Sequence, residues 1–181
     1  FNDQILHKIN RAHSRNIAIK TVQDAQISGF KNISIDLIYG LPNQTGQIWH
    51  KDLITANSLD IQHISTYGLK IEEGTVFGKN PPANLPNEDT NAETYIKTIK
   101  FLEQNGFMHY EISNYAKPSY ESKHNQCYWN NDEYIGTGLA AHGYLNNIRY
   151  SNTENLEEYL NNPTEPKETH PVSNQEKTEE A

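Results

Sequence analysis

The sequence predicts an α/β protein built around a mainly parallel sheet, and two observations carry this prediction. Segments with the spacing of amphipathic helices alternate with short segments rich in β-branched residues. The helical segments run for about 10–16 residues, which is long enough to connect neighbouring parallel strands. After Asn114 the alternation stops and a more aromatic, polar region begins.

The expected elements follow from capping residues and periodicity. Ser14 is a favourable N-cap for a helix that Gly29 should end, and Gly40 with Pro42 should stop the strand after it. Further elements are expected in this order: a strand over 32–38, a helix from Thr45, a strand over 63–69, a helix from Asp89 to Gly106, a strand over 107–113, a strand from 136 to 144 pairing with 148–151, and a short helix over 155–160.

The strand over 32–38 predicts a polar surface on one side of the sheet. Side chains alternate between the two faces of a strand, so Ile35 and Leu37 suit packing against helices while Ser34 and Asp36 point the other way. A carboxylate on an enclosed face is costly unless it holds a polar ligand. Asp36 is therefore either a ligand contact or merely solvated at the strand end.

Composition excludes several classes of function. The 181 residues carry a formal net charge of −8, and the basic residues are scattered, so we expect no nucleic-acid binding. No apolar run reaches the ~20 residues of a membrane span, so an integral membrane protein is not expected. The single cysteine, Cys127, cannot form an internal disulfide, which indicates a reducing, cytoplasmic setting.

Two local motifs each have a structural and a functional interpretation. Gly136, Gly138 and Ala141 have the spacing of a dinucleotide fingerprint, but they come after three βα units rather than after a first strand. Glycines that allow close approach of backbones explain them better. The run His124-Asn125-Gln126-Cys127-Tyr128-Trp129 offers an imidazole, a thiol and flat aromatic surface, which suits haem iron or a structural aromatic cluster.

Four segments together resemble one family. They are Arg11-Ala12-His13, Ser34 to Thr45 (SIDLIYGLPNQT), Tyr110 to Pro118 (YEISNYAKP), and His124 to Trp129 (HNQCYW). With these segments the chain resembles the coproporphyrinogen III oxidase-like radical SAM proteins. The resemblance extends from Phe1 to about Leu160. The last segment is typical of the haem-chaperone branch rather than of the oxidases.

The resemblance implies the C-terminal portion of an incomplete (β/α)6 radical SAM barrel plus a family-specific extension. Residues 1–115 are then expected to form the later part of the barrel and 116–161 the extension. Residues 162–181, rich in Pro, Thr, Glu and Lys, are expected to be a linker to a further C-terminal domain. Because the chain begins at Phe1, and Ser173 with Glu176 predicts a helix start close to its end, we expect it to be a piece of a longer protein.

The family holds a [4Fe-4S] cluster on a C-x-x-x-C-x-x-C motif, which this sequence lacks, and the cluster binds S-adenosylmethionine. By the resemblance, Arg11 and Asp36 contact S-adenosylmethionine, with Lys70 and His142 at two further contact positions. His124 corresponds to the histidine associated with haem binding, and is the candidate ligand to haem iron. No catalytic residue is expected in the chain itself, which should be inactive alone.

The function implied is that of a haem chaperone, which binds haem and delivers it in transient contacts to haem-dependent membrane enzymes. One alternative is oxygen-independent coproporphyrinogen III oxidase, which decarboxylates two propionates oxidatively in porphyrin biosynthesis. An unrelated alternative is an α/β barrel enzyme for a phosphorylated metabolite. It would need a phosphate-binding glycine loop, for which only Gly136 to Gly138 is available.

Overall fold

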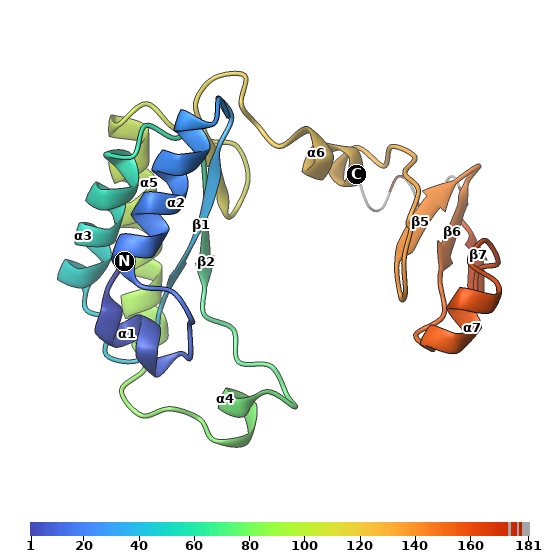
Figure 1. The fold of residues 1–181 in the computed structure, drawn as a ribbon, viewed down its shortest axis with the longest axis horizontal. Coiled ribbons are helices and arrows are strands. Elements are labelled where there is room, and N and C mark those ends of the chain that lie inside the picture. The colour runs from blue at the N-terminus through green and yellow to red at the C-terminus, as the bar shows by residue number, and fades with distance from the viewer. Residues whose placement is uncertain (174, 177, 179–181) are drawn as a thin grey trace. The chain divides into compact units, whose positions relative to one another are not determined.

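The chain folds into two compact units, each described here by itself. The computed structural model describes residues 1–173, 175, 176 and 178. The first unit spans Phe1–Glu121 and the second spans Ser122–Ala181 (Figure 1).

The first unit has the βα alternation that the sequence predicts. β1 and β2 are parallel and in register from Ser34 opposite His63 to Tyr39 opposite Gly68. The elements, in chain order, are α1 (Asp3–Lys8), α2 (Arg15–Ile27), β1 (Ser34–Tyr39), α3 (Gly46–Asn57), β2 (His63–Gly68), α4 (Val76–Lys79), α5 (Glu88–Gln104), β3 (Met108–His109) and β4 (Asn114–Ala116).

The third strand differs from the prediction. A single parallel strand was expected over 107–113, but only Met108–His109 forms β3, and the chain then reverses into β4. The Glu111 carboxylate accepts a hydrogen bond from the Ser113 backbone N–H at 2.9 Å, which closes the turn. β4 runs antiparallel to both neighbours and separates β3 from β2, so the strand order is β1-β2-β4-β3.

Helix starts follow the capping residues. Ser14 and Thr45 accept hydrogen bonds from the third residue of their helices, as expected for N-caps. The start of α5 was placed at Asp89, but Asn87 is the cap and the helix begins at Glu88. The Asn87 side chain satisfies the backbone N–H of Thr90, which makes it the better cap.

The core lies between the sheet and its covering helices. Figure 1 shows α2, α3 and α5 together on one face of β1 and β2. Leu53 of α3, Leu102 of α5 and Ile64 of β2 are almost completely buried there. The indole N–H of Trp49 donates to the Thr98 hydroxyl at 2.7 Å, which joins α3 to α5 inside this core.

The opposite face of the sheet is polar, as strand parity predicts, and we call it the polar face. Ser34 and Asp36 of β1 lie beside His63 and Ser65 of β2. The His63 imidazole is only 6% exposed, and its Nδ1 lies 2.7 Å from Ser34 Oγ while its Nε2 lies 2.6 Å from the Tyr110 hydroxyl oxygen. This chain of hydrogen bonds ties β1 and β2 to the β3–β4 turn.

The second unit is a small antiparallel sheet with two short helices. Its elements are α6 (Lys123–Trp129), β5 (His142–Leu145), β6 (Ile148–Ser151), α7 (Leu156–Asn161) and β7 (Glu168–Pro171), with strand order β5-β6-β7. The predicted pairing of 148–151 with the strand before it is confirmed, although that strand begins at His142 rather than at 136.

The stretch 162–181, which we expected to be a linker, contains the paired strand β7. Lys167 and Val172, on either side of β7, donate backbone hydrogen bonds to Ser151 and Asn147. Ser173 and Glu176 exchange the reciprocal hydrogen bonds of a capping box, which confirms that prediction. These bonds and the nearby His170 lower the pKa of Glu176 to about 2.

A truncation inside the core tests the packing of the first unit. Leu53→Ala should lower the free energy of unfolding by about 2–5 kcal/mol, because it removes a fully buried side chain and leaves a cavity. Urea denaturation followed by circular dichroism measures this. The neighbouring Ile54, which is 49% exposed, is the matched control: Ile54→Ala should cost clearly less, and equal losses would contradict the packing described.

Stability should also depend on the protonation of His63. Burial lowers the pKa of this imidazole, an effect that Asp36 and Glu111 partly oppose. Below about pH 6.5, the pKa of a free imidazole, the unfolded chain therefore takes up a proton that the folded state resists. The free energy of unfolding should fall until the pH reaches the lowered pKa, by at most about 1.4 kcal/mol per pH unit.

Denaturation of the wild type and of His63→Gln at several pH values checks this dependence. The wild type's advantage over His63→Gln should be largest near neutral pH and should shrink as the pH is lowered. His7→Gln, at an exposed position on α1, is the control and should not change the pH profile. An advantage that grows at low pH would mean that His63 is charged in the folded protein.

Candidate functional site

A pocket of about 330 Å³ lies along β1, at the edge of the sheet where the described residues provide no further strand. It is lined by α1, the loop after α1, α2, β1 and α3, and both Arg11 and Asp36 belong to its wall. Most of the remaining lining is apolar, contributed by residues such as Leu37 and Trp49. An apolar pocket with a few polar groups is the usual form of a small-molecule site.

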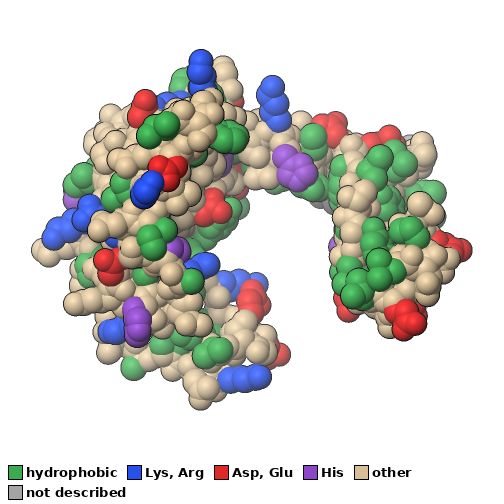
Figure 2. Space-filling view, viewed as in Figure 1, with side chains coloured by type: hydrophobic (Ala, Val, Ile, Leu, Met, Phe, Trp, Pro, Cys, Tyr) green, Lys and Arg blue, Asp and Glu red, His purple; other side chains and the backbone are tan. Residues whose placement is uncertain are grey.

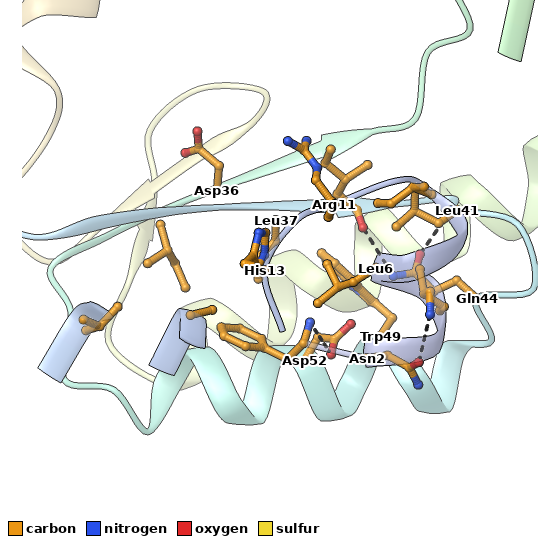
Figure 3. Close-up of a pocket in the computed structure, with 17 residues that line it drawn as sticks. Asn2, Leu6, Arg11, His13, Asp36, Leu37, Leu41, Gln44, Trp49 and Asp52 are labelled. Carbon is orange, nitrogen blue, oxygen red and sulfur yellow. Dashed lines mark hydrogen bonds and ion pairs between the residues drawn. The ribbon is translucent and has the colours of Figure 1, made fainter. Parts of the chain in front are cut away.

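Arg11 and Asp36 project to the same side of β1. Figure 3 shows both side chains extending away from Trp49 and Asp52, which lie on the side of α3. The backbone N–H of Arg11 donates to the Leu6 carbonyl at 2.9 Å, so the loop folds back onto α1. Neither the guanidinium nor the Asp36 carboxylate forms a hydrogen bond or ion pair with any part of the chain that the structure describes. The Arg11 guanidinium and the Asp36 carboxylate therefore line one pocket, and both can bind a ligand.

Asp36 occupies the middle of β1, whereas barrel sites usually lie at the carboxyl ends of the strands. Its carboxylate is exposed and neighbours the hydrogen-bond chain of Ser34, His63 and Tyr110. On the same polar face, the side-chain carbonyl oxygen of Asn114 is buried without a hydrogen-bond partner among the described residues. Such an acceptor favours a ligand that can donate a hydrogen bond.

Asp52 forms a second acidic group at the pocket, on the helix side. Its carboxylate is mostly buried, whereas the Asp36 side chain is exposed. Burial raises the pKa of Asp52. Asp36 is therefore the more accessible acidic group of the pocket.

Lys70 does not join Arg11 and Asp36 in the pocket. It lies in the loop that follows β2, with its side chain 82% exposed, and its ammonium pairs with the Glu72 carboxylate at 2.7 Å.

His124 and His142 belong to the second unit. His124 lies on α6, one turn before Tyr128, and the Tyr128 hydroxyl is 3.0 Å from its Nε2. The two rings meet edge to face with centroids 4.9 Å apart, and Tyr128 packs in the same way against Tyr134 at 4.5 Å. His142 opens β5 and is exposed. Arg11 and Asp36 belong to the first unit.

Cys127 is half-buried on α6, and its thiol donates to the Lys123 carbonyl at 3.3 Å. Among the described residues, no group of three or more His, Cys, Asp or Glu side chains is placed to hold a metal ion. A [4Fe-4S] cluster needs about three or four thiolates, so this chain's own residues do not fit one. Within the described ranges, no helix is long and apolar enough to cross a membrane.

Sequence reasoning missed the participation of His63 and Tyr110 in the polar face. Strand parity placed Ser34 there, and the same rule applied to β2 would have added His63. Tyr110 carries no comparable signal, because the unpredicted β3–β4 turn is what brings it to His63.

Comparison with known proteins identifies the relatives of the chain. No protein-family model matches it. It is 42% identical over 163 residues to "Heme chaperone HemW" of Lactococcus lactis, covering 88% of this chain and 43% of that protein. The protein of the same name from Bacillus subtilis is 38% identical over 187 residues, covering 99% of this chain and 49% of that protein. The protein of that name from Escherichia coli is 36% identical over 143 residues, covering 79% of this chain and 38% of that protein.

One solved structure has the same fold across both units. It is coproporphyrinogen III oxidase (HemN) from Escherichia coli, described as a radical SAM enzyme, with a TM-score of 0.82. It is 20% identical in sequence, and the match covers 96% of this chain and 44% of that one. The chain therefore shares the fold of a portion of that enzyme.

These matches confirm the resemblance that the four sequence segments indicate. The chain spans less than half the length of each of these relatives. Within that span, the chain is similar in sequence to the proteins named heme chaperone HemW, and it shares its fold with HemN.

Proposed function

We propose that the protein containing this chain is a haem chaperone, and that the chain supplies its haem-binding motif and part of an S-adenosylmethionine site. The observation that carries the proposal is the HNQCYW segment, with His124 held beside exposed aromatic surface, in a chain whose relatives are named heme chaperones. The protein would act in the cytoplasm and pass haem to haem-dependent membrane enzymes.

The chemistry of α6 fits haem. Haem iron accepts a neutral imidazole, and a porphyrin needs flat apolar surface against its faces. His124 is exposed, and Tyr128 and Trp129 are 41% and 44% exposed on the same helix. Exposed aromatic residues beside an exposed histidine are better explained by a bound apolar ligand than by packing within this unit.

Two neighbouring lysines are candidates for the haem propionates, and they differ in availability. Lys117 already pairs with Asp60 at 2.9 Å and lies over the ring of Phe107. Lys123 is exposed and adjacent to His124, with no ion pair to any described residue. Lys123 is therefore the proposed partner of a propionate.

Cys127 is a competing iron ligand on the same helix. Its thiol is engaged with the Lys123 carbonyl and is half-buried, whereas His124 is exposed. A thiolate would also need neighbouring positive charge to form, and the helix offers only Lys123. His124 is accordingly the proposed ligand.

The proposed S-adenosylmethionine contacts are Arg11 and Asp36. The cofactor's amino-acid portion carries both a carboxylate and an ammonium group, which a guanidinium and a carboxylate in one pocket can bind. Lys70 and His142 remain in the proposal on resemblance alone. The [4Fe-4S] cluster of the family would depend on cysteines outside this chain.

The same proposal assigns roles to the segments of the chain. Residues 1–115 would supply the later part of the barrel and 116–161 the chaperone-type extension. Residues 162–181 would lead to the remaining C-terminal part, with β7 attached to the extension. The oxidase alternative is supported by the fold match to HemN, but that match is 20% identical, whereas the relatives named heme chaperones reach 42%.

Haem titration of the longer protein tests the chaperone proposal. The wild type should develop a Soret band at one equivalent of haem, and His124→Ala should weaken binding or shift the band, because the iron loses a ligand. Cys127→Ser is the matched control on the same helix and should leave the band unchanged. A spectrum and affinity unaffected by His124→Ala, or lost in Cys127→Ser, would contradict the assignment.

Binding of S-adenosylmethionine to the longer protein tests the pocket beside β1. Arg11→Ala and Asp36→Asn should each weaken binding by roughly tenfold or more, since each removes a charge-assisted hydrogen bond worth about 1.5–3 kcal/mol. Isothermal titration calorimetry provides the measurement. Asp24→Asn, which changes a carboxylate on the exposed side of α2, is the control. Unchanged affinity in both pocket variants would exclude this site.

A further inference from the structure

We propose that one side of α7 is a docking surface for a basic amphipathic segment of the protein that receives haem. The surface consists of Leu156 and Leu160 with Glu154 and Glu157 beside them, and we call it the α7 surface. The role of the partner rests on the proposed haem-chaperone function, whereas the surface itself is argued from residues of the second unit alone.

Two neighbouring leucines of α7 are exposed to solvent. Leu156 and Leu160 are 59% and 68% exposed. They are four residues apart, so they lie next to each other on one side of the helix. Together with Glu154 and Glu157 they line a shallow hollow of the surface. Adjacent large apolar side chains in water are typical of a surface that another molecule covers.

Other residues fix the orientation of α7. The Tyr159 hydroxyl accepts a hydrogen bond from the Gly138 backbone N–H at 2.9 Å. The Glu158 carboxylate accepts one from the Thr153 hydroxyl at 2.7 Å. The Asn155 side chain accepts from two backbone N–H groups of the first turn. Because these bonds hold the helix, the two leucines face solvent as a consequence of the fold.

The second unit as a whole leaves much apolar surface exposed. Figure 2 shows hydrophobic side chains gathered on the visible face of this unit, with acidic side chains around them. Tyr144 and Val172 are the buried apolar residues among the described part of the unit. Large aliphatic side chains that are at least 39% exposed are, by contrast, Ile135, Leu139, Leu145, Ile148, Leu156 and Leu160. Covering some of this surface would be favourable.

Carboxylates around α7 decide which kind of partner fits. The segment 153–168 contains five glutamates and a single lysine. That lysine, Lys167, lies 3.6 Å from the Glu158 carboxylate, so its charge is already compensated. Glu154 and Glu157 form no ion pair with any residue that the structure describes. The α7 surface is therefore apolar with a negative margin, and it complements apolar residues flanked by Lys or Arg.

Two other occupants fit this surface less well. A second copy of the chain, in a two-fold contact, would place the α7 surface against itself and bring its carboxylates together. Like charges in such a contact repel each other. Anionic phospholipid headgroups would be repelled for the same reason.

Membrane proteins present segments of the required kind. Their cytoplasmic loops carry an excess of Lys and Arg close to the membrane. An amphipathic helix from such a region can bind another protein through its apolar side. Because α7 and the histidine of α6 belong to one compact unit, a partner bound at α7 is attached to the unit that is proposed to carry haem.

The experiment measures binding of a short fluorescent peptide to the longer protein. The peptide consists of Lys and Leu at helical spacing, and fluorescence anisotropy gives its affinity. A double variant, Leu156→Ser with Leu160→Ser, should bind the peptide about tenfold more weakly or worse, since it removes the apolar contact. Its circular dichroism and its haem affinity should match those of the wild type.

A charge variant and a control complete the experiment. Glu154→Gln with Glu157→Gln keeps the leucines and should weaken binding about threefold or more at low salt, with a smaller difference at high salt. The control, Leu139→Ser with Glu103→Gln, changes an exposed leucine and an exposed carboxylate elsewhere and should bind as the wild type does. If the leucine variant does not fold, the charge variant decides alone.

Contrary results separate this inference from the proposed function. Equal peptide affinity in the wild type and the α7 variants, or no binding by the wild type, would overturn the inference while the haem titration stands. Binding to vesicles of anionic phospholipid in preference to the peptide would also overturn it. A wild type that binds no haem would overturn the proposed function, and the peptide measurements would still decide whether α7 is a docking surface.

Discussion

The alternation of side chains along β1 and β2 is the constraint on which the first unit depends. One set of residues, including Leu37 and Ile64, enters the core beneath α3 and α5, and the other set lies on the polar face. A shift of one residue in register would bury Asp36 and expose Leu37, so the core and the ligand face are specified by the same pairing. The hydrogen bonds between His63 and the hydroxyl groups of Ser34 and Tyr110 hold that register from the polar side.

The second unit is held together by close contacts at its glycines rather than by a large hydrophobic core. Gly136 meets the His142 carbonyl, and the ring of Tyr150 covers Gly143 so closely that a side chain there would collide with it. Few large residues are fully buried in this unit, and Tyr144 is the main one. Apolar side chains are instead exposed around Tyr128 and Ile135. Exposed apolar surface of this kind is typical of a ligand-binding surface, whereas a packed core buries it.

Sequence reasoning recovered the elements whose signals are local. Capping by Ser14 and Thr45, the alternation in β1 and the pairing of β5 with β6 were all predicted correctly. The β3–β4 reversal was missed because it depends on a side-chain bond from Glu111, and β7 was missed because its pairing with β6 compensates for a polar sequence. For the site, the alternation of side chains along β1 identified Asp36, but only the folded chain shows that Lys70 pairs with Glu72.

The central proposal is that haem binds at α6, while Arg11 and Asp36 beside β1 contact S-adenosylmethionine. Hydrogen–deuterium exchange of the longer protein, measured with each ligand separately, tests it most directly. Haem should slow exchange in α6, and S-adenosylmethionine should slow exchange in the loop of Arg11 and in β1. Protection of β1 by haem, with α6 unchanged, would contradict the account.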